Sequence, residues 1–249
     1  MVKYVLSRIV LYSCVFYSSP LAAQNSGQDS SLTALQVGNA VKVYNAYTNA
    51  NLPLYNGRDY IPYTFKKEGN PFFESDSITA GMVNYAGRDY QKVPMLFDIA
   101  RNELVIVSYD DQHFIVLDND KVDSFHIRGH AFIRLVHNDS LPGSPPTGFY
   151  DRLYNGNIKV WAGRTKTFQE STAGGELIRI FSPRNYYYIF SNNTYYAAKN
   201  KKDILAIMSD KRHEMKKFSR KQKLKFNKKG MERAIVAVAT YYDRLNRLQ

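Results

Sequence analysis

The chain holds few of the residues on which redox, metal and covalent chemistry depend. It has one cysteine, Cys14, in 249 residues, and that cysteine lies in the N-terminal segment that we predict to be removed. Without a thiol, the mature chain has no disulfide, no thiolate metal site and no cysteine nucleophile. The sequence also lacks a Gly-x-Ser-x-Gly elbow, a phosphate loop, a dinucleotide fingerprint and a His-Glu-x-x-His motif. It therefore predicts no cofactor and no bound metal, and it gives an enzyme no direct support.

Long apolar runs are also missing, apart from a short one near the N-terminus. In residues 1–23, basic residues precede an apolar run at 9–17, and small residues follow as far as Ala23. This is the order of an export signal, and the run is too short to span a bilayer. We predict cleavage near Ala23, a soluble mature chain without a transmembrane segment, and a location in the periplasm or outer envelope. The alternative is a lipoprotein acylated at Cys14, which is disfavoured because Arg8 interrupts the apolar stretch.

Acidic residues are scarce in only one part of the chain. The net charge is +12. Residues 24–198 carry 16 basic and 17 acidic residues, whereas residues 199–233 carry 14 basic and 4 acidic residues. The densest basic run is our candidate site for an anion or a membrane surface, and we call its eight members the basic segment. They are Lys211, Arg212, Lys216, Lys217, Arg220, Lys221, Lys223 and Lys225.

The predicted export limits the partners that the basic segment can meet. Outside the cytoplasm the available polyanions are anionic lipid, lipopolysaccharide and acidic glycans, and another envelope protein is a further candidate partner. Salt confines the attraction to about 10 Å. Nucleic acid is not predicted, because no aromatic reading motif accompanies the lysines. The alternative interpretation is a solvated helix face that keeps the protein in solution, and the sequence indicates no oligomeric state.

A repeated hexapeptide marks the first half of the chain. It occurs at 55–60 as Tyr-Asn-Gly-Arg-Asp-Tyr and at 85–90 as Tyr-Ala-Gly-Arg-Asp-Tyr, with weaker echoes at 154–157 and 191–194. Each copy places Gly or Asn, which accept a positive φ, between aromatic or β-branched neighbours, as in a tight turn between antiparallel strands. Turn residues then recur about every eight to twelve positions, which is typical of strands that each pair with their predecessor.

We therefore predict a mainly β chain, with an antiparallel up-and-down meander that forms a bent sheet or half-barrel. The expected strands lie at 60–65, 82–85, 90–97, 104–109, 113–117, 122–127, 131–136, 149–154, 158–167, 186–190 and 195–198. Polar loops are expected at 66–71, 137–147 and 169–176. Twenty tyrosines, mostly inside these strands, indicate sheet faces that are broad and partly polar.

Helices are expected on both sides of the sheet region. Apolar spacing predicts a short helix at 40–47, and after residue 201 the apolar period changes from 2 to 3.6. The later pattern predicts a helical hairpin that is interrupted near Gly230. The predicted organisation is a flexible lead-in at 24–36, an antiparallel β domain with its N-terminal helix at 37–200, and a basic helical hairpin at 201–249 packed on the β domain.

Two smaller groups of polar residues are weaker candidates. Arg58 and Arg88 of the hexapeptides would contact one anion if both turns lay on one rim of the sheet. The alternative is that turn chemistry alone explains them. His126 and His130 would face the same side of a regular strand about 13 Å apart, too far apart to share a metal ion. The alternative is a bulge at Gly129, which would shorten this separation.

Several segments of the chain resemble a known family. They are Leu54–Gly57, Pro71–Phe73, Gly81–Tyr85 with Gly87 and Tyr90, Phe97–Asp98, Gly148–Asp151 and Ala237–Asp243. This pattern, spread over nearly the whole mature chain, is similar to a family of exported, uncharacterised proteins of Bacteroidetes-type Gram-negative envelopes. The resemblance implies a periplasmic or outer-envelope location, and it carries over no activity and no catalytic residues.

Three functional hypotheses follow from these patterns. The first is a non-catalytic envelope protein that binds a lipid-like or polyanionic ligand in a concavity of the sheet, or docks at a membrane surface through the basic segment. The second is a structural or assembly role, in which tyrosine-rich strands pair with another envelope protein. The third is a hydrolase that uses polar residues of the long loops.

Overall fold

The computed structural model describes residues 52–172 and 175–247. The predicted signal peptide with Cys14, the lead-in and the helix at 40–47 lie outside these residues.

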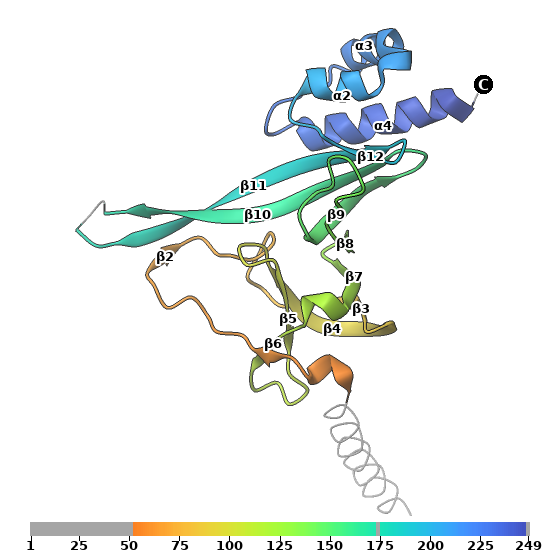
Figure 1. The fold of residues 1–249 in the computed structure, drawn as a ribbon. Helices are drawn as coiled ribbons and strands as arrows, with labels where there is room; N and C mark the ends of the chain where they lie inside the picture. Colours follow the sequence, from red (N-terminus) through yellow and green to blue (C-terminus); the bar gives the residue numbers. More distant parts are fainter. Residues whose placement is uncertain (1–51, 173–174, 248–249) are drawn as a thin grey trace, which may run out of the picture. The chain divides into compact units, whose positions relative to one another are not determined.

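Twelve strands in the described part of the chain form one sheet (Figure 1). They are β1 (Arg58–Asp59), β2 (Lys67–Glu68), β3 (Thr79–Tyr85), β4 (Arg88–Asp98), β5 (Glu103–Val107), β6 (Phe114–Val116), β7 (Val122–Ile127), β8 (His130–Leu135), β9 (Gly148–Asn155), β10 (Lys159–Ser171), β11 (Ile178–Ser191) and β12 (Thr194–Ala197). Their order is β1-β6-β5-β4-β3-β7-β8-β9-β10-β11-β12, and β2 pairs with β11. The sheet is bent and open, so the predicted mainly β, antiparallel fold is confirmed.

Two pairings depart from the predicted meander. Strand β7 pairs with β3 and not with β6, after the chain has passed through η2 (Asn119–Lys121). This pairing gives β3 a neighbour on both sides, which agrees with the burial of its Val83 and Tyr85 side chains. The loop expected at 66–71 contains β2, whose two residues pair in parallel with β11.

The first hexapeptide is not the hairpin turn that we predicted. Its first residue ends η1 (Pro53–Tyr55), and its Arg-Asp pair forms β1, which lies beside β6. A Cβ atom on Gly57 would collide with the carbonyl oxygen of Val116. Glycine is required there because β6 approaches closely, and not because a turn needs a positive φ.

The other three turn predictions are confirmed. In the second hexapeptide, Ala86 and Gly87 have φ values of 51° and 72° and join β3 to β4. Asn192 and Asn193 have φ values of 48° and 57° and join β11 to β12. The Asn-Gly pair at 155–156 lies in the hairpin between β9 and β10. Residues that tolerate a left-handed backbone mark these turns, as the sequence indicated.

The strand expected to begin at Tyr60 is absent, and a buried carboxylate organises the segment instead. Asp98 is fully buried and accepts hydrogen bonds from the hydroxyls of Tyr60 (3.0 Å) and Tyr63 (3.2 Å). It also accepts from the backbone N–H groups of Ala100 (3.0 Å) and Arg101 (3.1 Å). Burial beside this carboxylate raises the pKa of both tyrosine hydroxyls. Side-chain contacts therefore hold the segment in place of a strand ladder.

The hairpin of β10 and β11 is longer than predicted. Its ladder runs from Lys159 opposite Phe190 to Ser171 opposite Ile178, so part of the loop expected at 169–176 is strand. Phe168 and Phe181 lie directly opposite each other in this extension, with ring centroids 5.9 Å apart. Aromatic cross-strand pairs stabilise a ladder, and here they outweigh the polar residues that predicted a loop.

Two large apolar clusters and a small one, made by Leu96, Val105 and Val116, form the interior of the described part. The first contains rings from four strands, Phe97, Phe125, Phe132 and Phe149, with centroid separations of 4.9 to 5.9 Å. The second lies where residues of β10 and β11, such as Val160 and Ile189, meet the C-terminal helices. The bent sheet therefore buries one cluster among its own strands and the other beneath helices.

The predicted helical C-terminal region is confirmed, but its first limb is broken. The helices are α2 (Lys201–Ile207), α3 (Arg212–Lys221) and α4 (Met231–Arg247), with η3 (Ser209–Lys211) between the first two. Helix α4 contacts β9 and β10, and the C-terminal helices are drawn together in Figure 1. The stacked rings of Phe218 and Tyr241, with centroids 4.1 Å apart, join α3 to α4. No helix in the described ranges combines the length and apolar character needed to cross a bilayer.

A buried carboxylate on α4 fixes this helix to the sheet. Asp243 is 1% exposed and accepts hydrogen bonds from the Tyr154 hydroxyl (2.9 Å) and from the backbone N–H groups of Asn157 (2.7 Å) and Ile158 (3.4 Å). A Cβ atom on Gly156 would collide with this carboxylate. The helix therefore supplies the acceptor that the β9–β10 turn needs for its backbone donors.

Candidate functional site

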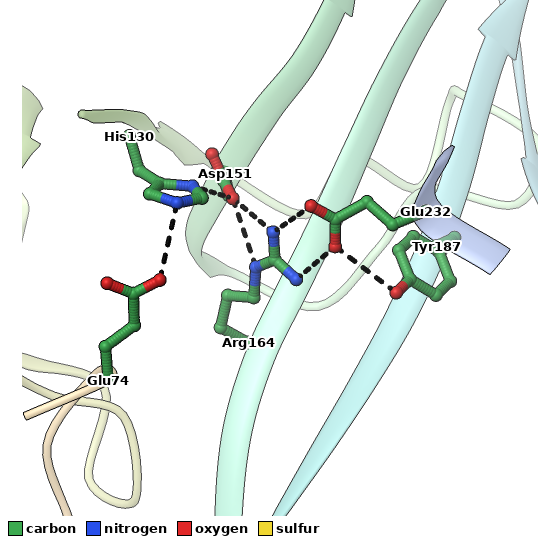
Figure 2. A network of polar contacts seen from close by, with 6 residues as sticks. All are labelled: Glu74, His130, Asp151, Arg164, Tyr187 and Glu232. Carbon is green, nitrogen blue, oxygen red and sulfur yellow. Dashed lines mark hydrogen bonds and ion pairs between the residues drawn. The ribbon is translucent and has the colours of Figure 1, made fainter. Parts of the chain in front are cut away.

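A histidine and a buried aspartate begin a polar network on the inner strands (Figure 2). His130 opens β8, directly after a turn at Arg128 and Gly129, whose φ values are 52° and 81°. His126 and His130 therefore lie on the two paired strands β7 and β8, in agreement with the separate strands predicted at 122–127 and 131–136. The Nδ1 atom of His130 lies 2.7 Å from Asp151 Oδ2, so the aspartate orients the ring.

An arginine joins this aspartate to the C-terminal helix. Arg164 of β10 donates from Nε (3.1 Å) and from a terminal nitrogen (2.5 Å) to Asp151, and its other contacts reach Glu232 of α4 at 2.6 and 3.0 Å. The side chains of Arg164 and Asp151 are 6% and 2% exposed, and that of Glu232 is 37% exposed. The Tyr187 hydroxyl donates to the same glutamate at 3.4 Å. The guanidinium therefore balances two carboxylates from two elements.

The network lines a hollow of about 560 Å³ that we call the polar cleft. Its lining includes Asn70, Phe73, Glu74, Ile99, His130, Arg164, Lys166, Phe181, Pro183, Asn185 and Glu232. The carboxylate of Glu74 lies 3.6 Å from Nε2 of His130, on a residue whose φ of 57° is left-handed. Such backbone strain in a non-glycine residue often accompanies functional sites.

Lys166 is the cation of the polar cleft that lacks an acidic partner. Its Nζ donates to the Asn70 side-chain oxygen at 3.0 Å and to the Phe72 carbonyl at 2.6 Å. Among the described residues no carboxylate forms an ion pair with it, although Asp76 and Asp98 act on its charge from a greater distance. Two of the three N–H groups of the ammonium have these protein acceptors. Burial lowers the pKa of Lys166. The ammonium is thus partly desolvated and can accept an anionic group.

The polar cleft does not supply the parts of a serine- or cysteine-type hydrolase. Its described lining residues include neither a hydroxyl nor a thiol that His130 could activate. Within the described ranges no group of three or more His, Cys, Asp or Glu residues has the spacing of a metal site. His137, in the longest loop, uses its ring for local contacts with the Pro145 carbonyl and Asp139. The hydrolase hypothesis therefore gains a histidine with acidic neighbours, but no hydroxyl or thiol nucleophile among the described lining residues.

A second hollow, which we call the tyrosine groove, lies between β11 and the chain that leads into α4. It has a volume of about 550 Å³. Its aromatic lining residues are Tyr186, Tyr187, Tyr188 and Phe226, and its basic ones are Arg184, Lys199 and Lys228. The three basic side chains are exposed, and they form no ion pair with any described acidic residue. Aromatic surface and unpaired cations therefore lie together.

The basic segment predicted from the sequence is exposed and unpaired. Lys211 is half-buried and the other seven residues are exposed, and none of the eight forms an ion pair with an acidic residue of the described part. Helix α3 buries Met215 and Ser219, so Lys216 and Lys217 lie on its solvent side. Lys223 and Lys225 lie in the link that continues to Phe226 in the tyrosine groove. Part of the basic segment therefore borders this groove.

Arg58 and Arg88 are not brought together. Arg58 forms an ion pair with Glu103 at 2.5 Å. The pairing of β1 with β6, of β6 with β5 and of β5 with β4 places Arg58 at the same level of the sheet as Leu96 of β4. Arg88 begins β4, eight residues before Leu96, which corresponds to about 27 Å along a strand. The structure therefore gives them no shared rim, and a joint anion site is not formed.

Sequence reasoning missed the network because its members are far apart in the chain. The separations are 21 residues from His130 to Asp151, 13 from Asp151 to Arg164 and 68 from Arg164 to Glu232. The sequence of β10 did contain one signal. Arg164 follows residues 160 and 162 at a spacing of two, so a strand places its side chain on the same buried face as theirs. A charge on a buried face requires a partner, although the sequence does not say which one.

The pH dependence of folding should report this network. The hydrogen bond with Asp151 raises the pKa of His130 above its ordinary value of 6.5. The folded state then holds the proton more tightly than the unfolded state, so this stabilisation is full below about pH 6.5 and is lost as pH rises through the folded-state pKa. We expect the free energy of unfolding, measured in urea, to fall between pH 6 and pH 8. A His130→Gln variant should show a smaller fall, and an equal fall would contradict the prediction.

Comparison with protein-family models, with curated proteins and with solved structures finds no match to this chain. The fold and the two hollows define a β-sheet protein with adjoining concave sites along β11. Inference about function therefore starts from the geometry of these hollows.

Proposed function

We propose that this chain is a non-catalytic, exported envelope protein that binds an anionic ligand in the tyrosine groove. The observation that carries the proposal is the placement of Arg184, Lys199 and Lys228, all without an acidic partner among the described residues, around an aromatic hollow of about 550 Å³. Pockets that hold a ligand are mostly apolar, with a few polar groups that fix its orientation. The groove has this composition, and all the charged side chains in its lining are basic.

The aromatic side chains give the groove a surface on which a ligand can pack. Tyr186 and Tyr188 are alternate residues of β11 and therefore lie on the same face of the strand. The side chain of Tyr186 is 49% exposed, and the Lys201 ammonium lies 5.3 Å from the ring centroid of Phe226. An amphipathic anion would bury its apolar part on these rings while its charge meets the lysines.

The basic segment supports a second candidate function, which is docking at an anionic membrane surface. Its side chains on α3 are exposed and unpaired in the described structure, as such docking requires. The groove has the stronger claim because it combines charge with concave shape, whereas a solvated helix face also explains α3. The two functions differ in which cations the ligand needs.

Binding measured for two matched variants separates these candidates. The groove variant carries Arg184→Gln, Lys199→Gln and Lys228→Gln, and the helix variant carries Lys216→Gln, Lys217→Gln and Arg220→Gln. Both lose three exposed charges. If each groove contact contributes about 0.5 kcal/mol, the groove variant should bind polygalacturonate about tenfold more weakly. The helix variant should stay within about threefold of the unmodified protein.

Calorimetry in two salt concentrations and sedimentation with anionic liposomes provide the measurements. Equal weakening in both variants would contradict a groove site and indicate attraction by total charge. Loss of liposome binding in the helix variant alone would favour membrane docking through the basic segment.

A further inference from the structure

We propose that the ligand of the tyrosine groove is an acidic oligosaccharide that continues over the edge of β11 into the polar cleft, where Lys166 binds one of its anionic groups. This inference rests on the proposed function and adds the chemical class and the path of the ligand. It follows from three observations, which are two hollows that adjoin along β11, an unpaired edge of β11 between them, and the Lys166 cation of neighbouring β10 in the polar cleft.

The two hollows share part of their lining. Pro183 and Asn185 line both the tyrosine groove and the polar cleft, and both side chains are exposed. Their volumes are about 550 and 560 Å³. A ligand that fills one hollow and follows β11 therefore reaches the other without a gap. Such a path suits a linear molecule with repeated units better than a compact one.

The backbone of β11 is uncovered where the hollows meet. Strand β2 pairs with β11 at Arg179 and Ile180, and β12 pairs with it from Tyr188 onwards. No described strand pairs with residues 181–186 on that edge. The Tyr187 carbonyl points to this edge, because it accepts a hydrogen bond from the Ala198 N–H. Backbone groups of alternate residues point to the same edge of a strand, so the N–H and C=O of Asn185 also point there. These two groups can bind ligand hydroxyls.

The same edge disfavours the other extended anions. A peptide added as a strand needs regular backbone donors, and Pro183 has none at the centre of the open edge. An acyl chain needs continuous apolar lining, but the polar cleft presents His130, Arg164 and Glu232. A sugar chain has hydroxyls for the backbone and C–H faces that pack on aromatic rings such as Tyr186 and Phe181. Its acidic groups would meet the cations.

Unpaired cations mark both ends of this path. Lys228 and Lys199 lie in the tyrosine groove, and Lys166 lies in the polar cleft, where two of its three N–H groups have protein acceptors. The Arg164 guanidinium is already bound to two carboxylates and is not available. A carboxylate or sulfate at Lys166 would form the charge-assisted contact that the protein leaves open.

Galacturonic acid oligomers of one to six residues test the proposal. Calorimetry with the mature protein should show an affinity gain of about tenfold or more between the dimer and the hexamer, because longer chains reach Lys166. Lys166→Met should reduce this gain to about twofold. Asn185→Trp, a change at an exposed residue that fills the junction of the hollows, should do the same. The control is Lys159→Met, which lies on β10 like Lys166 but lines neither hollow, and it should leave the gain unchanged.

The outcomes separate this inference from the function on which it rests. Binding at every length without a gain, or a gain retained in both junction variants, overturns the continuous path and leaves an anion site in the tyrosine groove. Absence of binding by the oligomers at every length, by anionic vesicles and by an acidic peptide overturns both proposals. If anionic vesicles or an acidic peptide bind in a Lys166-dependent way and the oligomers do not, the assignment to a glycan is overturned.

Discussion

Replacement of Arg164 by methionine should lower the free energy of unfolding by about 3 to 5 kcal/mol. The change removes the cation that balances Asp151, whose side chain is 2% exposed and has no other arginine or lysine partner among the described residues. Removing one member of a buried ion pair has a cost of this size because the other charge remains in a medium of low polarity. Glu232 contributes less, since its side chain is 37% exposed and water can solvate it.

Two further variants make the Arg164 result specific. Arg152→Met removes an exposed arginine from neighbouring β9 and should change the free energy of unfolding by less than about 0.5 kcal/mol. Arg164→Lys keeps the positive charge but cannot donate to Asp151 and Glu232 with the planar geometry of a guanidinium. It should therefore recover only part of the lost free energy of unfolding. Urea unfolding followed by circular dichroism gives all three values. A loss for Arg164→Met no larger than that for Arg152→Met would show that the network does not stabilise the fold.

Replacement of Asp98 by alanine should destabilise the protein by about 2 to 4 kcal/mol. Asp98 is fully buried and accepts four hydrogen bonds, two of them from the backbone N–H groups of Ala100 and Arg101. Each buried donor left without an acceptor costs about 1 to 3 kcal/mol. The two tyrosine donors are half-buried and recover part of the loss through water. The segment from Tyr60 to Tyr63 should then loosen from the β4–β5 turn.

A spectroscopic signature distinguishes this loss from general damage. Burial and the Asp98 carboxylate raise the pKa of Tyr60 and Tyr63, so their ionisation, followed by ultraviolet absorbance, should shift to lower pH in the variant. Asp123→Ala is the matched control, because Asp123 is exposed and has no described partner. An unchanged tyrosine titration in Asp98→Ala would contradict the role assigned to the carboxylate.

Local chemistry predicted most strands because their signals lie within a few residues. The turn at Ala86 and Gly87 and the turn at Asn192 and Asn193 are decided by residues that accept a left-handed backbone. The same signal failed at Gly57, where glycine is needed for the close approach of β6. A sequence pattern cannot separate these two uses of glycine, because the second depends on a strand that is remote in the chain.

The candidate sites show the same limit more strongly. The basic segment was visible because charge density is a local property, and its exposure in the structure agrees with that pattern. The polar cleft was not visible, since His130, Asp151 and Glu232 meet only after four elements have packed together. Asp98 resembled an ordinary turn residue, although it is fully buried. A site whose residues are far apart in the chain could therefore be recognised only in the folded structure.

The cap that Asp243 places on the β9–β10 turn has a consequence for the timing of synthesis. Asp243 accepts a hydrogen bond from the Asn157 N–H and lies 86 residues after Asn157 in the chain. At about 5 to 20 residues per second, the ribosome needs about 4 to 17 s to supply the acceptor after the turn has been made. During this interval the turn has no carboxylate to receive its donors, and α4 cannot cover β9 and β10.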